Sequence, residues 1–151
     1  MVNQLRPALV MTALFTLLLG LAYPLAVTGI AQVAFPDQAN GSLVRDPGGR
    51  VVGSSLIGQP FVGATYLHPR PSAAGDGYDA AASSGSNMGP LNPDLIARVA
   101  ESAQTIRAED GSGVIPADAV TTSGSGLDPD VSPAYARLQA ARIARARGVS
   151  V

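Results

Sequence analysis

A long uncharged segment near the N-terminus constrains the fold of this chain more than any other feature. No charged residue occurs between Arg6 and Asp37, and the stretch LVMTALFTLLLGLAYPLAVTGIAQVA (Leu9 to Ala34) is predominantly apolar. This stretch of about 26 residues is longer than the roughly 20 that a helix needs to cross about 30 Å of hydrocarbon. The sequence therefore predicts a transmembrane helix over residues 9–34, after a short cytoplasmic N-terminus over residues 1–8.

A cleaved signal peptide is the alternative to an anchor that is retained. Leu9 to Ala22 alone has the length of a signal-peptide core, and small residues follow it. Because the apolar sequence continues past that point without a convincing A-x-A cleavage site, we expect an uncleaved anchor. Pro24 lies inside the span, where it should kink the helix and free one carbonyl group.

Small side chains form a stripe along the predicted anchor. Thr12, Thr16 and Gly20 recur every four residues, a spacing that lets the backbone of a partner helix approach closely, although small residues are common in any membrane helix. Arginines flank the span on both sides, so the charge balance only weakly favours an N-terminus inside the cell and an exported polar domain.

Residues 35–151 are expected to form one small mixed domain, which makes the whole chain a membrane-anchored α/β (α+β) protein. Short runs of β-forming residues at 43–44, 51–52 and 56–57, with Pro47-Gly48-Gly49 between the first two, predict a hairpin. Residues 63–93 show no sustained period, and loops of this length are usually functional or held by something else. Since only 5% of the chain is aromatic, the core of this domain should be thin.

The first of two predicted helices begins with Asn92 as its cap and Pro93 at its first position, and Gly111 follows its end. Its spacing predicts an apolar face made of Ile96, Val99, Ala103 and Ile106.

The second predicted helix begins at Ser132-Pro133 and runs to about Arg147, with Gly148 suited to end it. Its predicted apolar face, Ala134, Leu138 and Ala141, is poor, so we expect the helix to need a partner surface.

Composition excludes several classes of function. A net charge of −1 argues against nucleic-acid binding, because no excess of cations is available to neutralise phosphates. The absence of cysteine excludes disulfides, thiolate catalysis and zinc–thiolate sites. A single histidine excludes a multi-histidine metal site, and we expect neither a catalytic residue nor a metal ligand.

His68 supports the one enzymatic alternative, a membrane-tethered extracytoplasmic hydrolase that uses His68 with Ser72 or Ser86. No G-x-S-x-G motif surrounds any serine, and a histidine in a turn before Pro69 is the simpler interpretation. A third hypothesis is an exported domain that binds sugars or wall polymers, which predicts a chain cleaved near Ala31.

The loop TTSGSGLDPDVSP (Thr121 to Pro133) combines hydroxyls, glycines and two carboxylates. It lacks the lysine of a phosphate-binding loop. It also lacks the glycine and glutamate that would complete a calcium loop around Asp128 and Asp130. We therefore expect a structured connector that docks the second helix.

Four stretches, in this order, carry a resemblance to a known family: RPAL, GSSLIGQPF, YLHPRPSA with the later SSGSNMGPLNP, and VTTSGSGLDPDVSP with QAARIARAR. Together they resemble the KdpC family, whose members are one of the components of the bacterial Kdp potassium-transporting P-type ATPase. The resemblance spans nearly the whole chain.

The resemblance implies a single-pass inner-membrane subunit with an extracytoplasmic domain. It implies three partner subunits: one channel-like and potassium-translocating, one ATP-hydrolysing, and one very small with a single helix. The family is described as stabilising the complex and as a catalytic chaperone that raises the ATP affinity of the hydrolysing subunit. K⁺ and ATP are thus implied through the complex, and no cofactor is expected on this chain. The partner-contact residues we expect are Thr12, Thr16, Gly20, Arg70, Ser72, Ser86, Asn87, Ser125, Asp128, Gln139 and Arg142.

The chain departs from the family pattern at three places. Leu67 follows Tyr66 where the family usually has an aromatic residue, and Asp130 stands where histidine or asparagine is frequent. The family normally continues past the second helix with a further helix and a strand, so we expect a domain without them.

Overall fold

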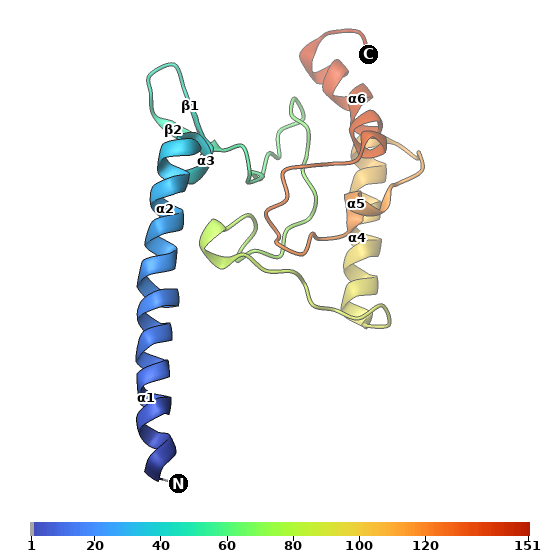
Figure 1. Cartoon of the computed structure of the whole chain (residues 1–151). Coiled ribbons are helices and arrows are strands. Elements are labelled where there is room, and N and C mark those ends of the chain that lie inside the picture. The colour runs from blue at the N-terminus through green and yellow to red at the C-terminus, as the bar shows by residue number, and fades with distance from the viewer. Residues whose placement is uncertain (1) are drawn as a thin grey trace. The chain divides into compact units, whose positions relative to one another are not determined.

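The computed structural model describes residues 2–151; residue 1, in the predicted tail over 1–8, lies outside the described part. The chain separates into two compact units, one ending at Val52 and the other running from Gly53 to Val151. The first contains a long apolar helix and the second a small set of helices joined by irregular segments (Figure 1). The predicted class, a membrane-anchored α+β chain, is confirmed.

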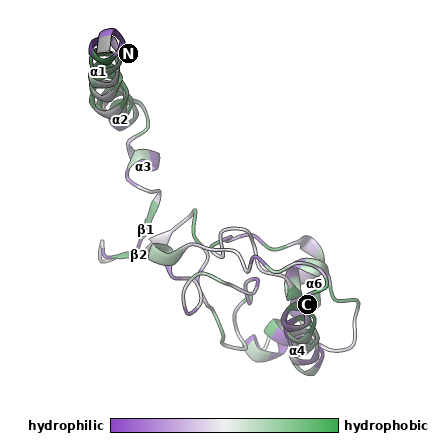
Figure 2. Ribbon diagram, turned by 90° about the horizontal axis from the view of Figure 1, so that it is seen from below, coloured by the Kyte–Doolittle hydropathy of each residue, from purple (hydrophilic) through white to green (hydrophobic). Residues whose placement is uncertain are grey.

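The first unit is built on α1 (Val2–Leu17), a π-helical segment η1 (Leu18–Ala22) and α2 (Tyr23–Ala34). These elements form a continuous helix whose stretch Asn3–Ala34 has a mean hydropathy of 2.0 and is long and apolar enough to cross a membrane. Figure 2 shows apolar residues along this helix. None of its side chains is buried within the chain, which fits a helix that exposes its apolar surface to lipid or to other helices.

The π-helical segment lies directly before Pro24. Proline has no N–H to donate to the carbonyl four residues earlier, and its ring crowds that carbonyl. The N–H of Tyr23 is donated to the oxygen of Leu18, five residues back, so the turn is wider than an α-helical turn. The predicted disturbance at Pro24 thus takes the form of a π turn, a recognised way for a helix to accommodate proline.

After α3 (Pro36–Ala39), strands β1 (Leu43–Arg45) and β2 (Val51–Ser54) pair as the predicted hairpin. The carboxylate of Asp46 organises its turn by accepting hydrogen bonds from the backbone N–H groups of Gly48 at 2.9 Å and Arg50 at 3.0 Å. The prediction of a further β segment at 56–57 is wrong. These residues form a turn instead, because the Oγ of Ser54 accepts the N–H of Leu56.

The second unit contains η2 (Ala80–Ala82), α4 (Pro93–Asp110), α5 (Ala117–Val120) and α6 (Pro133–Arg147). Both helix starts are as predicted: Asn92 caps α4 by accepting the N–H of Asp94 at 2.8 Å, and Ser132 caps α6 by accepting that of Tyr135 at 3.0 Å. The predicted end of α6 is also confirmed, since Gly148 lies in the left-handed region with φ 67°.

The core between these helices is small, as the composition predicts. Its buried members are Ile106, Ala119, Val120 and Tyr135, with Val99, Ala103, Ile115, Val131 and Leu138 packed around them. Three of the four residues on the predicted face of α4 therefore contribute. The fourth, Ile96, is 58% exposed because it lies one turn before the region that α5 and α6 cover.

The prediction for the buried face of α6 is wrong in an informative way. Ala134 and Ala141 are exposed, and the buried residues are Tyr135, Gln139, Arg142 and Ala144. Two long polar side chains are thus directed inward, where hydrogen bonds satisfy them. A search for apolar periodicity does not find such a face.

Gly126 tests how tightly the loop before α6 is packed. It is buried with φ +67°, and a Cβ there would lie 2.6 Å from the oxygen of Ser84 and 2.7 Å from the nitrogen of Ala74. We expect Gly126→Ala to lower the free energy of unfolding by about 2–4 kcal/mol, measured by chemical unfolding in detergent micelles.

Gly124→Ala is the matched control, because the space around its added Cβ is open. Equal losses for the two variants would mean that the loop is not packed as described.

Candidate functional site

The loop from Thr121 to Pro133 lies at the centre of the irregular part of the second unit. Its backbone pairs with two distant segments: Gly58 donates its N–H to the oxygen of Leu127, and Ser84 donates its N–H to that of Ser125, both at 2.9 Å. These bonds hold segments that have no helix or strand of their own. The prediction of a structured connector is confirmed by these contacts.

Ser72 fastens the loop to the preceding segment. Its Oγ donates to the oxygen of Gly126 at 2.6 Å and accepts the N–H groups of Ala74 and Tyr78 at 3.1 and 2.8 Å. One hydroxyl thus satisfies three backbone groups. Ser125 acts more locally, since its Oγ accepts the N–H of Leu127 at 3.1 Å.

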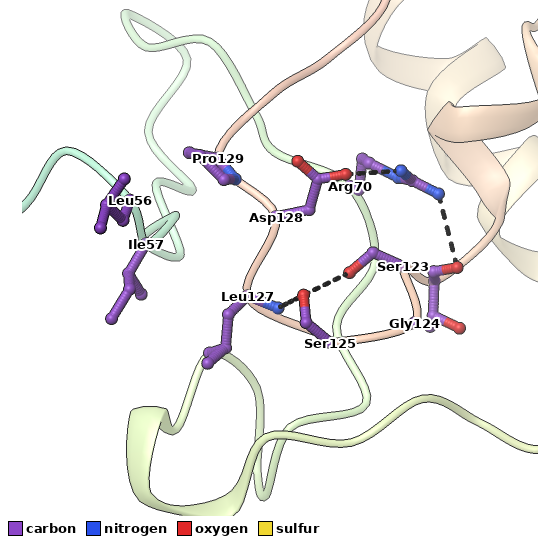
Figure 3. Close-up of a pocket in the computed structure, with 10 residues that line it drawn as sticks. Leu56, Ile57, Arg70, Ser123, Gly124, Ser125, Leu127, Asp128 and Pro129 are labelled. Carbon is purple, nitrogen blue, oxygen red and sulfur yellow. Dashed lines mark hydrogen bonds and ion pairs between the residues drawn. The ribbon is translucent and has the colours of Figure 1, made fainter. Parts of the chain in front are cut away.

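Arg70 and Asp128 form an ion pair at the mouth of this loop. The Nη1 of Arg70 lies 2.7 Å from the Oδ2 of Asp128, and Figure 3 shows the two side chains pointing toward one another. The other carboxylate oxygen accepts the N–H of Asp130 at 3.0 Å. They border an open pocket of about 570 Å³ that also contains Ser123, Gly124 and Ser125.

The chemistry of this pocket favours positioning over ligand capture. The charge of Arg70 is already matched by Asp128, so no net positive charge remains to hold a phosphate. Nearby, burial raises the pKa of Tyr78, and the Asp128 carboxylate adds to this while Arg70 opposes it. The Tyr78 hydroxyl donates to the oxygen of Arg70 at 2.8 Å, which ties it to the same structure.

Ser86 and Asn87 are the predicted site residues of the long loop. Ser86 is half-buried, whereas Asn87 is exposed and has a positive φ of 52°, a conformation that asparagine tolerates better than most residues. Neither lines the pocket beside Arg70.

A second polar cluster joins α6 to α4 and to the segment before His68. The Nε of Arg142 donates to Asp110 at 2.8 Å, with the two side chains only 8% and 2% exposed. Its Nη1 donates to the backbone oxygens of Ala64 at 2.8 Å and Tyr66 at 3.1 Å. Gln139, fully buried, also bonds to both backbone groups of His68. These two predicted contact residues therefore hold the domain together from inside.

The ring of His68 is engaged within the same region. Its Nδ1 lies 3.4 Å from Glu109, and its Nε2 lies 3.2 Å from the oxygen of Gly63. A Ser–His dyad needs a hydroxyl on one ring nitrogen, and Ser72 is committed to backbone groups instead. The geometry of these residues therefore gives the hydrolase hypothesis no support.

Thr12, Thr16 and Gly20 lie along one exposed stripe of the apolar helix. Together with Met11, Phe15 and Leu19 they line a shallow hollow of about 600 Å³ on its surface. A Cβ added at Gly20 would meet nothing within 4 Å in the isolated chain. The spacing is that of a helix-packing surface, so contact with a partner helix stays a prediction.

Sequence reasoning missed Asp110 and Asp118, two carboxylates that organise α6. Asp118 accepts the N–H of Ser132 at 2.7 Å and its hydroxyl at 2.9 Å, which fixes the start of the helix. Each lies at the end or beginning of a short element far from its partner in sequence. A position next to Gly111 or in the first turn of α5 was the only available signal.

Comparison with known proteins identifies the family. The family model described as "KdpC: K+-transporting ATPase, c chain" matches residues 5–151. A protein of Caulobacter vibrioides named "Potassium-transporting ATPase KdpC subunit" is 70% identical over 149 residues, which are 99% of this chain and 76% of the relative. The proteins of that name from Beijerinckia indica and Mycobacterium tuberculosis are 65% and 57% identical, covering 77% and 80% of those relatives.

The chain belongs to the KdpC family. The resemblance recognised from the four motif stretches is thereby confirmed. Two of these stretches supply Ser72 and Gly126, whose contact joins them in the folded KdpC domain.

Tyr135 adds a titratable group to the core of this KdpC domain. It is 4% exposed, and burial raises the pKa of its hydroxyl to about 12, with the neighbouring Asp110 charge adding to the effect and Arg142 opposing it. The folded domain therefore holds the neutral phenol more strongly than the unfolded chain does.

The buried pair should be essential to stability. We expect Arg142→Met to lower the free energy of unfolding by about 3–5 kcal/mol, because it leaves the Asp110 carboxylate buried without its partner. Arg145→Met, on the exposed side of the same helix, should change it by less than about 0.5 kcal/mol. Chemical unfolding followed by circular dichroism compares them, and similar losses would contradict this role for Arg142.

Tyr135 should make the domain sensitive to alkali. Between pH 10 and about 12 the unfolded chain loses the phenolic proton that the folded domain retains, so stability falls as pH rises through this window. Unfolding measured below and above pH 10 should show a smaller fall in Tyr135→Phe than in the unchanged chain. Tyr66→Phe, at a tyrosine that is 51% exposed, should leave the fall unchanged; an identical fall in both variants would argue against the assignment.

Proposed function

We propose that this chain is a non-catalytic, membrane-anchored accessory subunit of an ATP-driven potassium-uptake complex. In this role it stabilises assembly and promotes ATP binding by the hydrolysing subunit. Its partners are a channel-like potassium-translocating subunit, the ATP-hydrolysing P-type subunit and a small single-helix subunit. The complex lies in the bacterial inner membrane, with the N-terminus of this chain cytoplasmic and the polar domain outside.

The observation that carries the proposal is the family match over residues 5–151, which includes both the apolar helix and the polar domain. The relatives that match along 99% of the chain or more are named as subunits of a potassium-transporting ATPase. An apolar helix with an open small-residue stripe supports a role in assembly, because such stripes let helices pack closely within a membrane.

The side chains of the polar domain support an accessory role over an enzymatic one. Ser72, Gln139 and Arg142 bond to backbone groups that would otherwise be unsatisfied. Asp128 and Asp110 each face an arginine. These side chains are used to position the segments of the domain.

Any effect on ATP affinity must pass through the partner subunits. With the polar domain outside the membrane, none of its residues can reach cytoplasmic nucleotide. The coupling is then an allosteric free energy between the external contact and the nucleotide site, of the size usual for such couplings, about 1–3 kcal/mol.

Deleting the chain and restoring it in trans tests this function. We expect deletion to abolish growth in potassium-limited medium. The KM for ATP of whatever complex can still be purified should rise at least about fivefold. Restoring the unchanged chain should reverse both effects, and detergent extraction should recover it in a stoichiometric complex.

Two glycine variants separate assembly from expression. Gly20→Leu fills the stripe and should reduce co-purification. Gly29→Leu, which also enters open space but lies outside the stripe, should not. Recovery of the chain only as a free monomer, with potassium uptake unaffected by its loss, would refute the proposed function.

A further inference from the structure

A groove separate from the Arg70 pocket crosses the second unit beside α4. It has a volume of about 420 Å³ and is bordered by the proline-rich segment around His68, by the last turns of α4 and by Ala119 and Tyr135. Its walls are largely apolar, with Phe61, Ile106 and three prolines: Pro60, Pro69 and Pro71. The volume is enough for a small number of side chains.

One hydroxyl in this groove has no partner. Tyr135 is 4% exposed and lines the groove, and its hydroxyl makes no hydrogen bond within the described part of the chain. The other tyrosine of the groove differs, because the hydroxyl of Tyr78 donates to the oxygen of Arg70. A nearly buried phenol without a partner loses hydrogen-bonding free energy, which a bound acceptor would restore.

The charge of the groove is acidic. Glu101 and Glu109 line it from α4, and none of the lining residues is an arginine. His68 is the only other group there that can become cationic, and it faces Glu109 at 3.4 Å. The carboxylate of Glu109 is 42% exposed and so remains open to a second cation. An anionic lipid headgroup would be repelled from such a surface.

The segment that forms the outer wall is held in place from behind. Arg142 bonds to the oxygens of Ala64 and Tyr66, and Arg147 bonds to that of Thr65 at 2.7 Å. Phe61 and Tyr66 stack with their ring centres 5.4 Å apart. A wall fixed in this way loses little conformational entropy when it binds.

We propose that this groove binds a segment of a partner polypeptide in which an apolar side chain stands next to an arginine or lysine. The apolar side chain packs against Phe61 and the prolines, and the cation reaches Glu101 and Glu109. A backbone carbonyl of the segment accepts the Tyr135 hydroxyl. The inference rests on the proposed function, in which the segment is an extracytoplasmic loop of another subunit of the complex.

Site-specific photocrosslinking in cells tests this interface. A benzoylphenylalanine replaces Val62, which is 84% exposed at the groove, and in a control it replaces Val114, which is 95% exposed and outside it. In cells that express the whole complex, we expect the Val62 probe to crosslink to one loop of a partner subunit. Mass spectrometry should place the crosslink beside an arginine or lysine.

Substitutions in the groove then test the contacts. Glu101→Gln with Glu109→Gln should lower the Val62 crosslink yield at least about fivefold. Asp76→Asn with Asp130→Asn, which removes the same charge from exposed loops, should not. Tyr135→Phe should lower the yield while leaving the unfolding midpoint at neutral pH unchanged, because the hydroxyl has no partner inside the domain.

A crosslink from Val62 to lipid or to a second copy of this chain would overturn the inference, as would equal crosslinking from Val62 and Val114. These outcomes leave the proposed function intact if the chain still co-purifies with the complex. Failure of co-purification together with normal potassium uptake would instead refute the proposed function.

Discussion

The guanidinium group of Arg142 is the interaction on which the rest of the polar domain depends. It joins the end of α4, through Asp110, to the backbone around Ala64 and Tyr66. A charge this deeply buried costs several kcal/mol unless it is paired and fully hydrogen-bonded, and here a carboxylate and three further acceptors satisfy it. A domain with few large apolar side chains is thus stabilised by a network whose loss would leave buried groups unpaired.

The same economy of apolar residues explains the loops. About forty residues between the hairpin and α4 contain only a short 3₁₀ helix, and such a segment must bond its backbone groups elsewhere. The loop before α6 supplies those partners through Ser125, Gly126 and Leu127. Hydroxyls and glycines serve here because they reach backbone groups without adding bulk. The loop that resembles a ligand site in sequence is therefore a structural junction, while the acidic groove lies beside α4.

The elements with local signals were predictable. Length and hydropathy identify the apolar helix, and the caps at Asn92 and Ser132 with the stop at Gly148 locate two further helices. Their physics acts within a few residues of the chain. The buried face of α6 was not predictable, because it depends on Asp110 and on carbonyl groups from residues 64–68 that lie far away in sequence.

The sequence by itself determined that this chain carries a membrane anchor, a thin-cored mixed domain and the motifs of its family. Only the tertiary structure decided which polar residues are internal and which face outward. Arg70 and Asp128 neutralise one another across 58 positions of sequence, whereas Glu109 and Tyr135 are brought together beside one groove. The physical reason is that charge pairing and burial depend on neighbours in space, and those neighbours exist only after the chain has folded.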